Sequence, residues 1–301
     1  MASRRHHFGN TVFSATLAAL VGVTVAIAFA PGEASADPAV SKVNWKLDVS
    51  GGGAEPGYDF GGIPFSSGDI ETVFKVRGAV SIPIAYSYGL QLDGAVGSYD
   101  GSVFGHGAAH LFWRDPDVAL FGGYASWTHW NGIDAYRVGI EGEYYAGNVT
   151  LSGLIGSEFG DVDNELFSYA ELSFYAMDDL KLSIGHHYAP EVGHMLTTGA
   201  EYQFRSTPSA GYAVYAEADF GENGYQSIFG GFKMYFGDSK SLIRRHREDD
   251  PDFRDDLGSV ISCVDNSDLG QELSTQDIET PIKREPYGYP CSDDFENREP
   301  L

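Results

Sequence analysis

Basic residues, cysteines and long apolar runs are all scarce in this chain of 301 residues. Lysine and arginine number 19 against 43 acidic residues, and a formal net charge of −24 argues against nucleic-acid binding, which needs cations opposite the phosphates. The two cysteines, Cys263 and Cys291, imply no disulfide framework, and the sequence leaves open whether they pair. A mean hydropathy of −0.21 argues against a bundle of membrane-spanning helices.

One apolar run, from Thr11 to Ala30, is the exception. Arg4 and Arg5 precede it, and Ala34-Ser35-Ala36 follows with the small residues of a signal-peptidase site. We therefore predict that residues 1–36 are a signal peptide, cleaved near Ala36, and that the mature chain lies outside the cytoplasm. An uncleaved anchor helix is the alternative, because the run is nearly long enough to span a bilayer.

Glycine and aromatic residues are plentiful, and apolar side chains recur at every second position. In the hairpin from Asp134 to Phe159, Val138 and Ile140 alternate with Arg137 and Glu141. A period of two places one set on each face of a strand. An apolar face of this length fits a strand that faces lipid, with the charged set turned toward a wet interior.

The same alternation recurs along the chain in about twelve segments. They are 43–49, 74–82, 86–96, 102–113, 118–127, 136–144, 149–159, 166–176, 180–188, 196–204, 212–220 and 228–236. We predict an all-β fold over residues 37–238, a transmembrane antiparallel up-and-down β-barrel of about twelve strands, with ten to fourteen tolerated. The facing of segments 102–113 and 118–127 stays open, and Gly51 to Asp69 is interpreted as a long loop on the outer side.

The charged face of these segments defines the candidate site. We expect its side chains to line the lumen, paired across strands or hydrated, because unpaired charge is costly away from water. The candidate lumen-lining residues are Lys75, Arg77, Asp93, Arg137, Glu141, Glu143, Glu158, Glu171, Lys181, Glu201, Glu217 and Lys233.

The alternation stops at Ser239. Arg244-Arg245-His246-Arg247 is followed by an acidic block, and the remainder is acidic and poor in apolar residues. Residues 239–301 are therefore predicted to be a largely disordered periplasmic tail. A periplasmic arm that binds a partner is the alternative.

The signal peptide, the repeat of aromatic strands and a last strand with Phe232, Met234 and Phe236 resemble the outer-membrane β-barrels of Gram-negative bacteria. The resemblance covers about Val43 to Gly237. It implies that the assembly machinery reads the three residues of the last strand. The segment from Lys240 to Pro251 also resembles the ending of porin-like barrel proteins of uncharacterised function.

Candidate chemistry is sparse. His106 and His110 share a strand face and either bind a metal or serve as interior side chains; no third ligand is placed by the sequence. His186 and His187 are adjacent and point to opposite faces. A loop with Asp161, Asp163, Asn164 and Glu165 holds calcium or is simply solvated. No Ser-His-acid spacing is recognisable, so we expect no catalytic residues, metal or cofactor.

These patterns predict an outer-membrane barrel that acts as a small porin-like channel for ions or small polar solutes. A non-conducting structural or adhesive barrel is the alternative, and an outer-membrane hydrolase is the third possibility. The expected partners are the lipid bilayer, lipopolysaccharide and the outer-membrane assembly machinery, with no nucleic acid.

Overall fold

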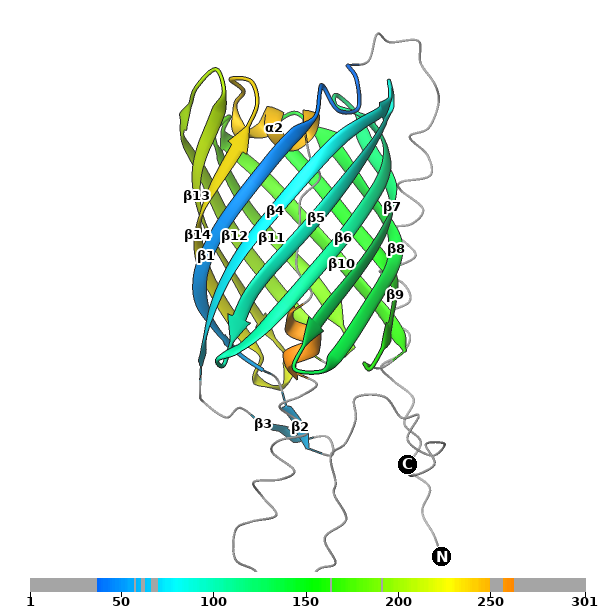
Figure 1. Ribbon diagram of the computed structural model, residues 1–301, viewed down its shortest axis with the longest axis vertical. Coiled ribbons are helices and arrows are strands. Elements are labelled where there is room, and N and C mark those ends of the chain that lie inside the picture. The colour runs from blue at the N-terminus through cyan, green and yellow to red at the C-terminus, as the bar shows by residue number, and fades with distance from the viewer. Residues whose placement is uncertain are drawn as a thin grey trace, which may run out of the picture. The chain divides into compact units, whose positions relative to one another are not determined.

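The protein folds as a closed antiparallel β-barrel (Figure 1). The computed structural model describes residues 37–56, 58–60, 63–65, 70–162, 164–190, 192–249 and 257–262. Within these residues the barrel strands are β1 (Asn44–Glu55), β4 (Glu71–Ala85), β5 (Tyr88–Tyr99), β6 (Ser102–Asp115), β7 (Ala119–Trp130), β8 (Ile133–Ala146), β9 (Val149–Gly160), β10 (Glu165–Met177), β11 (Leu180–Ala189), β12 (Gly193–Ser206), β13 (Ala210–Gly221) and β14 (Gln226–Phe236). Each strand pairs with the next along the chain, which confirms the predicted up-and-down barrel.

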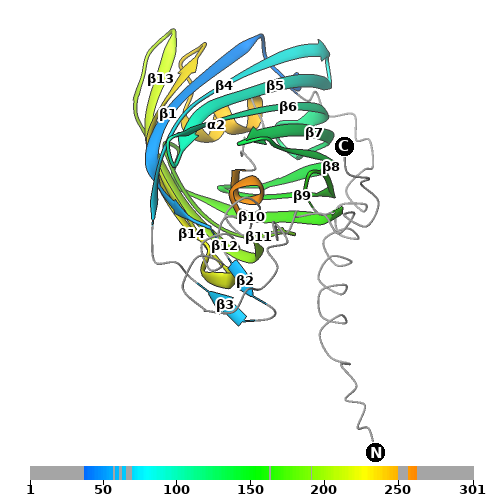
Figure 2. The same cartoon turned by 60° about the horizontal axis from the view of Figure 1, so that its bottom comes forward.

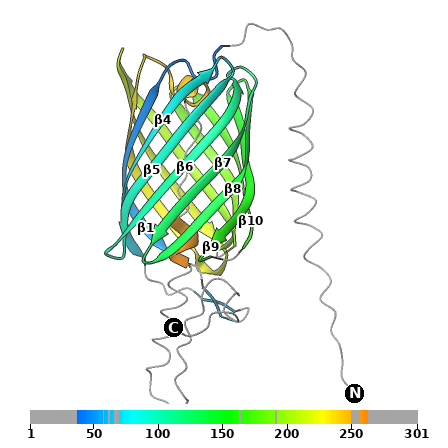
Figure 3. The ribbon, with the colours of Figure 1, turned by 45° about the vertical axis from the view of Figure 1, so that its right-hand side comes forward.

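The barrel closes where the last strand meets the first. β14 pairs with β1 over eleven residue pairs, from Trp45 opposite Phe236 to Glu55 opposite Gln226. Closure satisfies the backbone groups that an open edge would expose to hydrocarbon. In Figure 3 the neighbouring strands from β4 to β10 run side by side at a common tilt, as a closed barrel requires.

Two of the connections are two-residue turns with left-handed backbone at both positions. Asp100 and Gly101 have φ of 44° and 72°, and Asn131 and Gly132 have φ of 50° and 88°. Asp-Gly and Asn-Gly adopt this geometry most readily, and its twist matches that of the flanking strands. These turns fix the register of the β5–β6 and β7–β8 hairpins.

The segment from Gly51 to Asp69 differs from its prediction as one long loop. β1 continues to Glu55, and β2 (Tyr58–Phe60) pairs with β3 (Ile63–Phe65) in a separate two-stranded sheet. Glycine is needed at one point of this extension, because a Cβ on Gly52 would come within 2.0 Å of the Ile228 carbonyl oxygen. The glycine-rich composition therefore reflects close strand packing as well as loop.

Within the segment predicted to be a largely disordered tail after Ser239, two stretches are helical. α2 (Leu242–Glu248) is an α-helix, and residues 257–262, here called the inner helix, are helical too. The β10–β11 turn holds the N-terminus of α2: Leu242 N donates to Asp179 Oδ1 (3.0 Å) and Ile243 N donates to the Asp178 carbonyl (3.0 Å). Among the described residues no helix is both long and apolar enough to cross a bilayer.

Candidate functional site: the barrel interior

The outer face of the barrel is apolar. Val138, Ile140, Leu172, Leu196 and Ile228 are all exposed, and Ile140 in the middle of β8 has 54% of its surface accessible. Exposed side chains of this kind recur on all twelve strands, far beyond the isolated apolar patches of a soluble protein. A belt of this composition needs hydrocarbon around it.

The inner face carries the charge. Of the twelve candidate lumen residues, nine are buried, namely Lys75, Arg77, Asp93, Arg137, Glu158, Glu171, Lys181, Glu201 and Lys233. The other three, Glu141, Glu143 and Glu217, are half-buried. The facing of β6, which the sequence left open, is also defined: His106 and His110 are buried on the inner face, while the next residue, Leu111, is exposed on the outer face.

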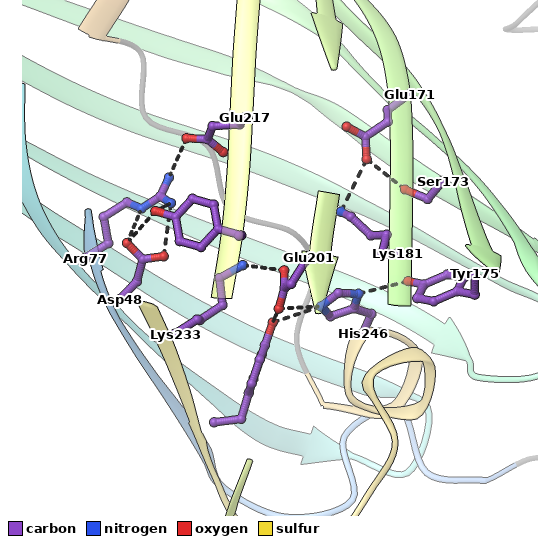
Figure 4. Close-up of polar contacts among 12 residues, drawn as sticks. Asp48, Arg77, Glu171, Ser173, Tyr175, Lys181, Glu201, Glu217, Lys233 and His246 are labelled. Atoms are coloured by element: carbon purple, nitrogen blue, oxygen red, sulfur yellow. Dashed lines mark hydrogen bonds and ion pairs between the residues drawn. The ribbon is translucent and has the colours of Figure 1, made fainter. Parts of the chain in front are cut away.

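Arg77 on β4 is the centre of the first charged group (Figure 4). Its guanidinium donates to both oxygens of Asp48, with Nε–Oδ1 at 3.0 Å and Nη2–Oδ2 at 3.1 Å. The Tyr215 hydroxyl on β13 lies 2.6 Å from Arg77 Nη2 and donates to Asp48 Oδ1. Glu217 Oε1 lies 3.8 Å from both Arg77 Nη1 and Lys75 Nζ. Pairing of this kind offsets the loss of hydration of the buried charges.

Glu201 on β12 is the centre of a second group (Figure 4). It accepts hydrogen bonds from Lys233 Nζ at 2.7 Å and from the Tyr235 hydroxyl at 2.5 Å. The ring of His246 on α2 lies between two hydroxyls, with Nε2 2.9 Å from Tyr235 Oη and Nδ1 2.9 Å from Tyr175 Oη. A residue of the C-terminal segment is therefore part of the interior network.

Two further ion pairs lie on the inner wall. Lys181 Nζ is 3.4 Å from Glu171 Oε1, and Arg137 Nε is 2.6 Å from Glu158 Oε2. Arg137 Nη2 also donates to the hydroxyl of Ser259 on the inner helix, at 2.9 Å. The inner helix thus contacts the charged wall directly.

His110 is held between two carboxylates, and this arrangement favours the interior role over the metal role. Its Nε2 lies 2.8 Å from Asp93 Oδ2 and its Nδ1 lies 2.8 Å from Glu141 Oε2. His106 instead hydrogen-bonds the Thr128 hydroxyl through Nδ1 at 2.8 Å. Among the described residues no group of three or more His, Cys, Asp or Glu side chains could hold a metal.

The other candidate ligands are also dispersed. His186 Nε2 lies 3.0 Å from His194 Nδ1 on the exposed surface. In the acidic loop, Asp161 Oδ2 accepts the Asp134 backbone N–H at 3.0 Å, and Asp163 lies outside the described residues. The calcium interpretation of this loop therefore gains no geometric support from the part of the loop that is described.

The C-terminal segment covers one end of the barrel. Arg245 is fully buried and donates to Gln203 Oε1 at 2.7 Å and to the Asp238 carbonyl at 2.9 Å. Arg247 donates to the carbonyls of Gly147 and Val149 in the β8–β9 turn, at 2.9 and 2.8 Å. α2 thus binds strand ends from opposite sides of the barrel mouth.

Ion pairs reinforce this end. Lys240 Nζ lies 2.5 Å from Asp249 Oδ1 and 3.2 Å from Glu248 Oε2. Lys42 lies 2.6 Å from Asp238, and its hydrogen bond lowers the pKa of the Asp238 carboxyl. Hydrogen bonding to Glu248 raises the pKa of the neighbouring Arg244 guanidinium. Asp238 and Arg244 therefore stay charged near neutral pH.

The inner helix fills the other end. Leu257, Val260 and Ile261 are buried in one apolar cluster with inward-facing wall residues that include Phe104 and Phe229. Figure 2 shows the helix, in orange, within the ring of strands and near the end that carries β2 and β3. We call residues 240–249 and 257–262 together the C-terminal plug.

Two small cavities lie along the described part of the inner wall. One of about 60 Å³ lies between the inner helix and wall residues such as Arg137 and Glu217. Another of about 70 Å³ lies beside His110, Glu141 and Tyr169. Each has room for a few water molecules and no more.

Sequence reasoning missed the residues that join the plug to the wall: Arg245, His246, Arg247 and Ser259. It identified the basic run but treated it as solvated.

The residues proposed as an assembly signal lie on the closing strand β14, where Phe232 and Phe236 are exposed on the outer face and Met234 is half-buried. The predicted signal peptide and both cysteines lie outside the described residues.

A closed barrel with an apolar outer face and a charged inner face is the architecture of a transmembrane β-barrel. In its fold the chain is therefore a β-barrel of the transmembrane type. Neither a family model nor a curated protein sequence matches it.

Several solved structures are similar to this chain in fold, all at low sequence identity. The KdgM porin is 12% identical, with a TM-score of 0.45 over 62% of this chain and 97% of that one. An outer membrane channel from Pseudomonas putida F1 is 12% identical, with a TM-score of 0.46 over 69% and 98%. Outer membrane phospholipase A from Escherichia coli is 11% identical, with a TM-score of 0.40 over 68% and 99%. At this identity the function has to be inferred from the chain's own residues.

Proposed function

We propose that the protein is a small porin-like channel of the bacterial outer membrane for ions or small polar solutes, held closed by its C-terminal plug. The observation that supports this proposal is the charged inner wall. Ionisable side chains extend along it from Asp93 and His110 to Glu201 and Lys233. A barrel that served only as a scaffold could fill its interior with apolar side chains at less desolvation cost.

The closed state follows from the plug. α2 and the inner helix occupy opposite ends, and the cavity beside the inner helix, of about 60 Å³, has room for only a few waters. Passage of a solute therefore requires the plug to leave the lumen. The ion pairs along the wall would then be exposed to water, where charged side chains set ion preference.

A non-conducting structural or adhesive barrel is the second candidate function. The dense pairing of wall charges and the small cavities favour it, because these features also describe a permanently filled barrel.

We propose no enzymatic activity. A hydrolase would need a nucleophile and a base near one rim, and lipid hydrolysis by the purified barrel would support that role instead.

The proposed location in the outer membrane leads to four further expectations about the chain. The signal peptide is cleaved near Ala36, the assembly machinery reads Phe232, Met234 and Phe236, and the outer face contacts lipid and lipopolysaccharide. The connections at the α2 end, such as Arg114 to Val118 and Ala146 to Val149, then face the periplasm.

Planar-bilayer conductance tests the proposal. The full-length mature chain is compared with two truncations, one that ends at Asp249 and keeps α2, and one that ends at Asp238 and removes the whole plug. We expect the full-length chain to be nearly silent and the shortest chain to conduct. Heat-modifiable migration on gels verifies that each truncated barrel is folded.

A folded barrel that ends at Asp238 and still fails to conduct would overturn the channel and favour the structural alternative. High conductance of the full-length chain, equal to that of the truncations, would show that the plug does not close the lumen.

A further inference from the structure

Two histidines on neighbouring strands meet on the outer face, close to the rim that carries β2 and β3. β11 runs in the same direction as β1, so its last residues lie at this end of the barrel. After Ile184, the next outward positions on β11 are His186 and Tyr188, and Tyr188 lies directly opposite His194 on β12. His186 and His194 are therefore diagonal neighbours on one face. The sequence could not pair them, because they belong to different strands.

The facing ring nitrogens of this pair are spaced as two ligands of one metal ion. His186 Nε2 and His194 Nδ1 are 3.0 Å apart, and both side chains are exposed. Imidazole nitrogens bind a zinc-sized ion at about 2.0–2.1 Å, so two nitrogens at this spacing would subtend an angle of about 91–97° at the metal. That is close to the right angle of square-planar or octahedral coordination and smaller than the tetrahedral angle that zinc prefers.

Contacts around the pair hold it in this arrangement. The ring of Tyr188 packs on His194 with centroids 4.9 Å apart, and the Tyr188 hydroxyl donates to Glu165 Oε2 at 3.3 Å. The backbone N–H of His194 donates to Glu222 Oε2 at 3.0 Å. The Glu222 carboxylate therefore brings a negative charge to the edge of the pair, and this charge favours a bound cation.

A hydrogen bond between two neutral imidazoles also gives a distance of 3.0 Å. One facing nitrogen then carries a proton, and the bond contributes little at an exposed position, where water competes for both partners. A metal ion replaces that proton and binds both lone pairs. The same exposure lets water occupy the coordination positions that two protein ligands leave open.

We propose that His186 and His194 bind one Cu²⁺ ion, with water as the remaining ligands. At a given nitrogen site, affinity rises along the first-row divalent metals to Cu²⁺ and falls again at Zn²⁺, and Cu²⁺ favours angles near 90° in tetragonal geometry, so Cu²⁺ fits this pair best. The site is separate from the charged interior, because both imidazoles lie on the outer face. In the orientation proposed above, it faces the outside of the cell.

Copper binding by the purified, full-length mature chain tests this proposal. The chain carries no polyhistidine tag, is held in detergent micelles and is titrated with Cu²⁺ against a competing chelator. We expect one high-affinity Cu²⁺ per chain, and nitrogen splitting in its EPR spectrum that corresponds to two imidazoles. His194→Gln should weaken binding by about 10-fold or more and leave one imidazole, because loss of even an outer-shell partner costs about 10–100-fold in metal affinity.

His129→Gln is the matched control. His129 also faces outward near this rim, but its Nδ1 is bonded to Asp134 Oδ1 at 2.9 Å rather than to a second imidazole. We expect this variant to bind Cu²⁺ as tightly as the unaltered chain. Heat-modifiable migration verifies that each variant is folded.

Equal Cu²⁺ affinity of the unaltered chain and the variant with both His186→Gln and His194→Gln would overturn the proposal. So would an EPR spectrum of the unaltered chain with a single imidazole, a result that needs no variant. Neither measurement uses conductance or the location of the protein, so the copper site can fail independently of the proposed channel.

Discussion

Individual side chains in this barrel follow one rule: outward positions contact lipid and inward positions pair charge. The rule could be predicted for Ile140 and Glu141 from their alternation alone, because facing on a strand depends only on position parity. The hydrogen-bond and ion-pair partners of the inward residues could not be predicted in this way. His110 is placed between Asp93 on β5 and Glu141 on β8 by the register of four strands, and no local pattern contains that information.

The outer face is tested by Ile140→Arg. Ile140 lies near the middle of β8 and is 54% exposed, so arginine there would be placed in hydrocarbon. We expect a loss of about 2–4 kcal/mol in the free energy of folding into bilayers. Equilibrium unfolding of the reconstituted barrel in denaturant measures it.

Glu143→Gln is the matched control on the same strand. Its side chain faces inward and its hydrogen bond with the Tyr145 hydroxyl, 2.7 Å long, can be kept by an amide. A loss for Glu143→Gln as large as that for Ile140→Arg would contradict the assigned facing.

At the scale of elements, the strands were predictable and the plug was not. Strand signals are local, since period-two alternation and turns such as Asn131-Gly132 lie within a few residues of each other. α2 has seven residues, too few for a helical period to stand out, and its run of Arg245, His246 and Arg247 resembles a solvated charge block. Its stability comes from distant partners such as Gln203 and the β8–β9 turn. The apolar pair Leu242-Ile243 was the one available signal.

Arg247→Ala tests how α2 is held. The substitution removes two hydrogen bonds to the carbonyls of Gly147 and Val149 and the stacking on Tyr145. Hydrogen bonds of charged groups contribute about 1.5–3 kcal/mol, so the undocked population of α2 should rise by about 10- to 100-fold. The rate of tryptic cleavage after Arg245, followed by mass spectrometry, reports that population.

Arg244→Ala is the control for this change. Arg244 is largely exposed and its hydrogen-bond partner is Glu248 within the same helix. If the two substitutions accelerate cleavage equally, Arg247 does not hold α2 to the barrel.

As a whole molecule, the chain uses its barrel wall to meet lipid and its own C-terminal segment to fill the lumen. The wall was predictable because twelve alternating segments close only as a barrel. Which segment fills the lumen depends on the position of the chain after Phe236. That part of the chain is acidic and polar and has no repeating apolar pattern from which its position could be predicted. In the proposed function, the channel is closed at rest and conducts when the plug leaves.

Amide hydrogen exchange of residues 240–249 in the folded, full-length barrel is the most direct test of this account. The amides of Leu242, Ile243, Arg245 and Asp249 donate to Asp179, Asp178, Ser241 and Arg245 respectively, and they should exchange far more slowly than in a free peptide of the same sequence. Exchange at the rate of the free peptide, from a barrel that remains heat-modifiable, would contradict a lumen closed by its own C-terminal segment.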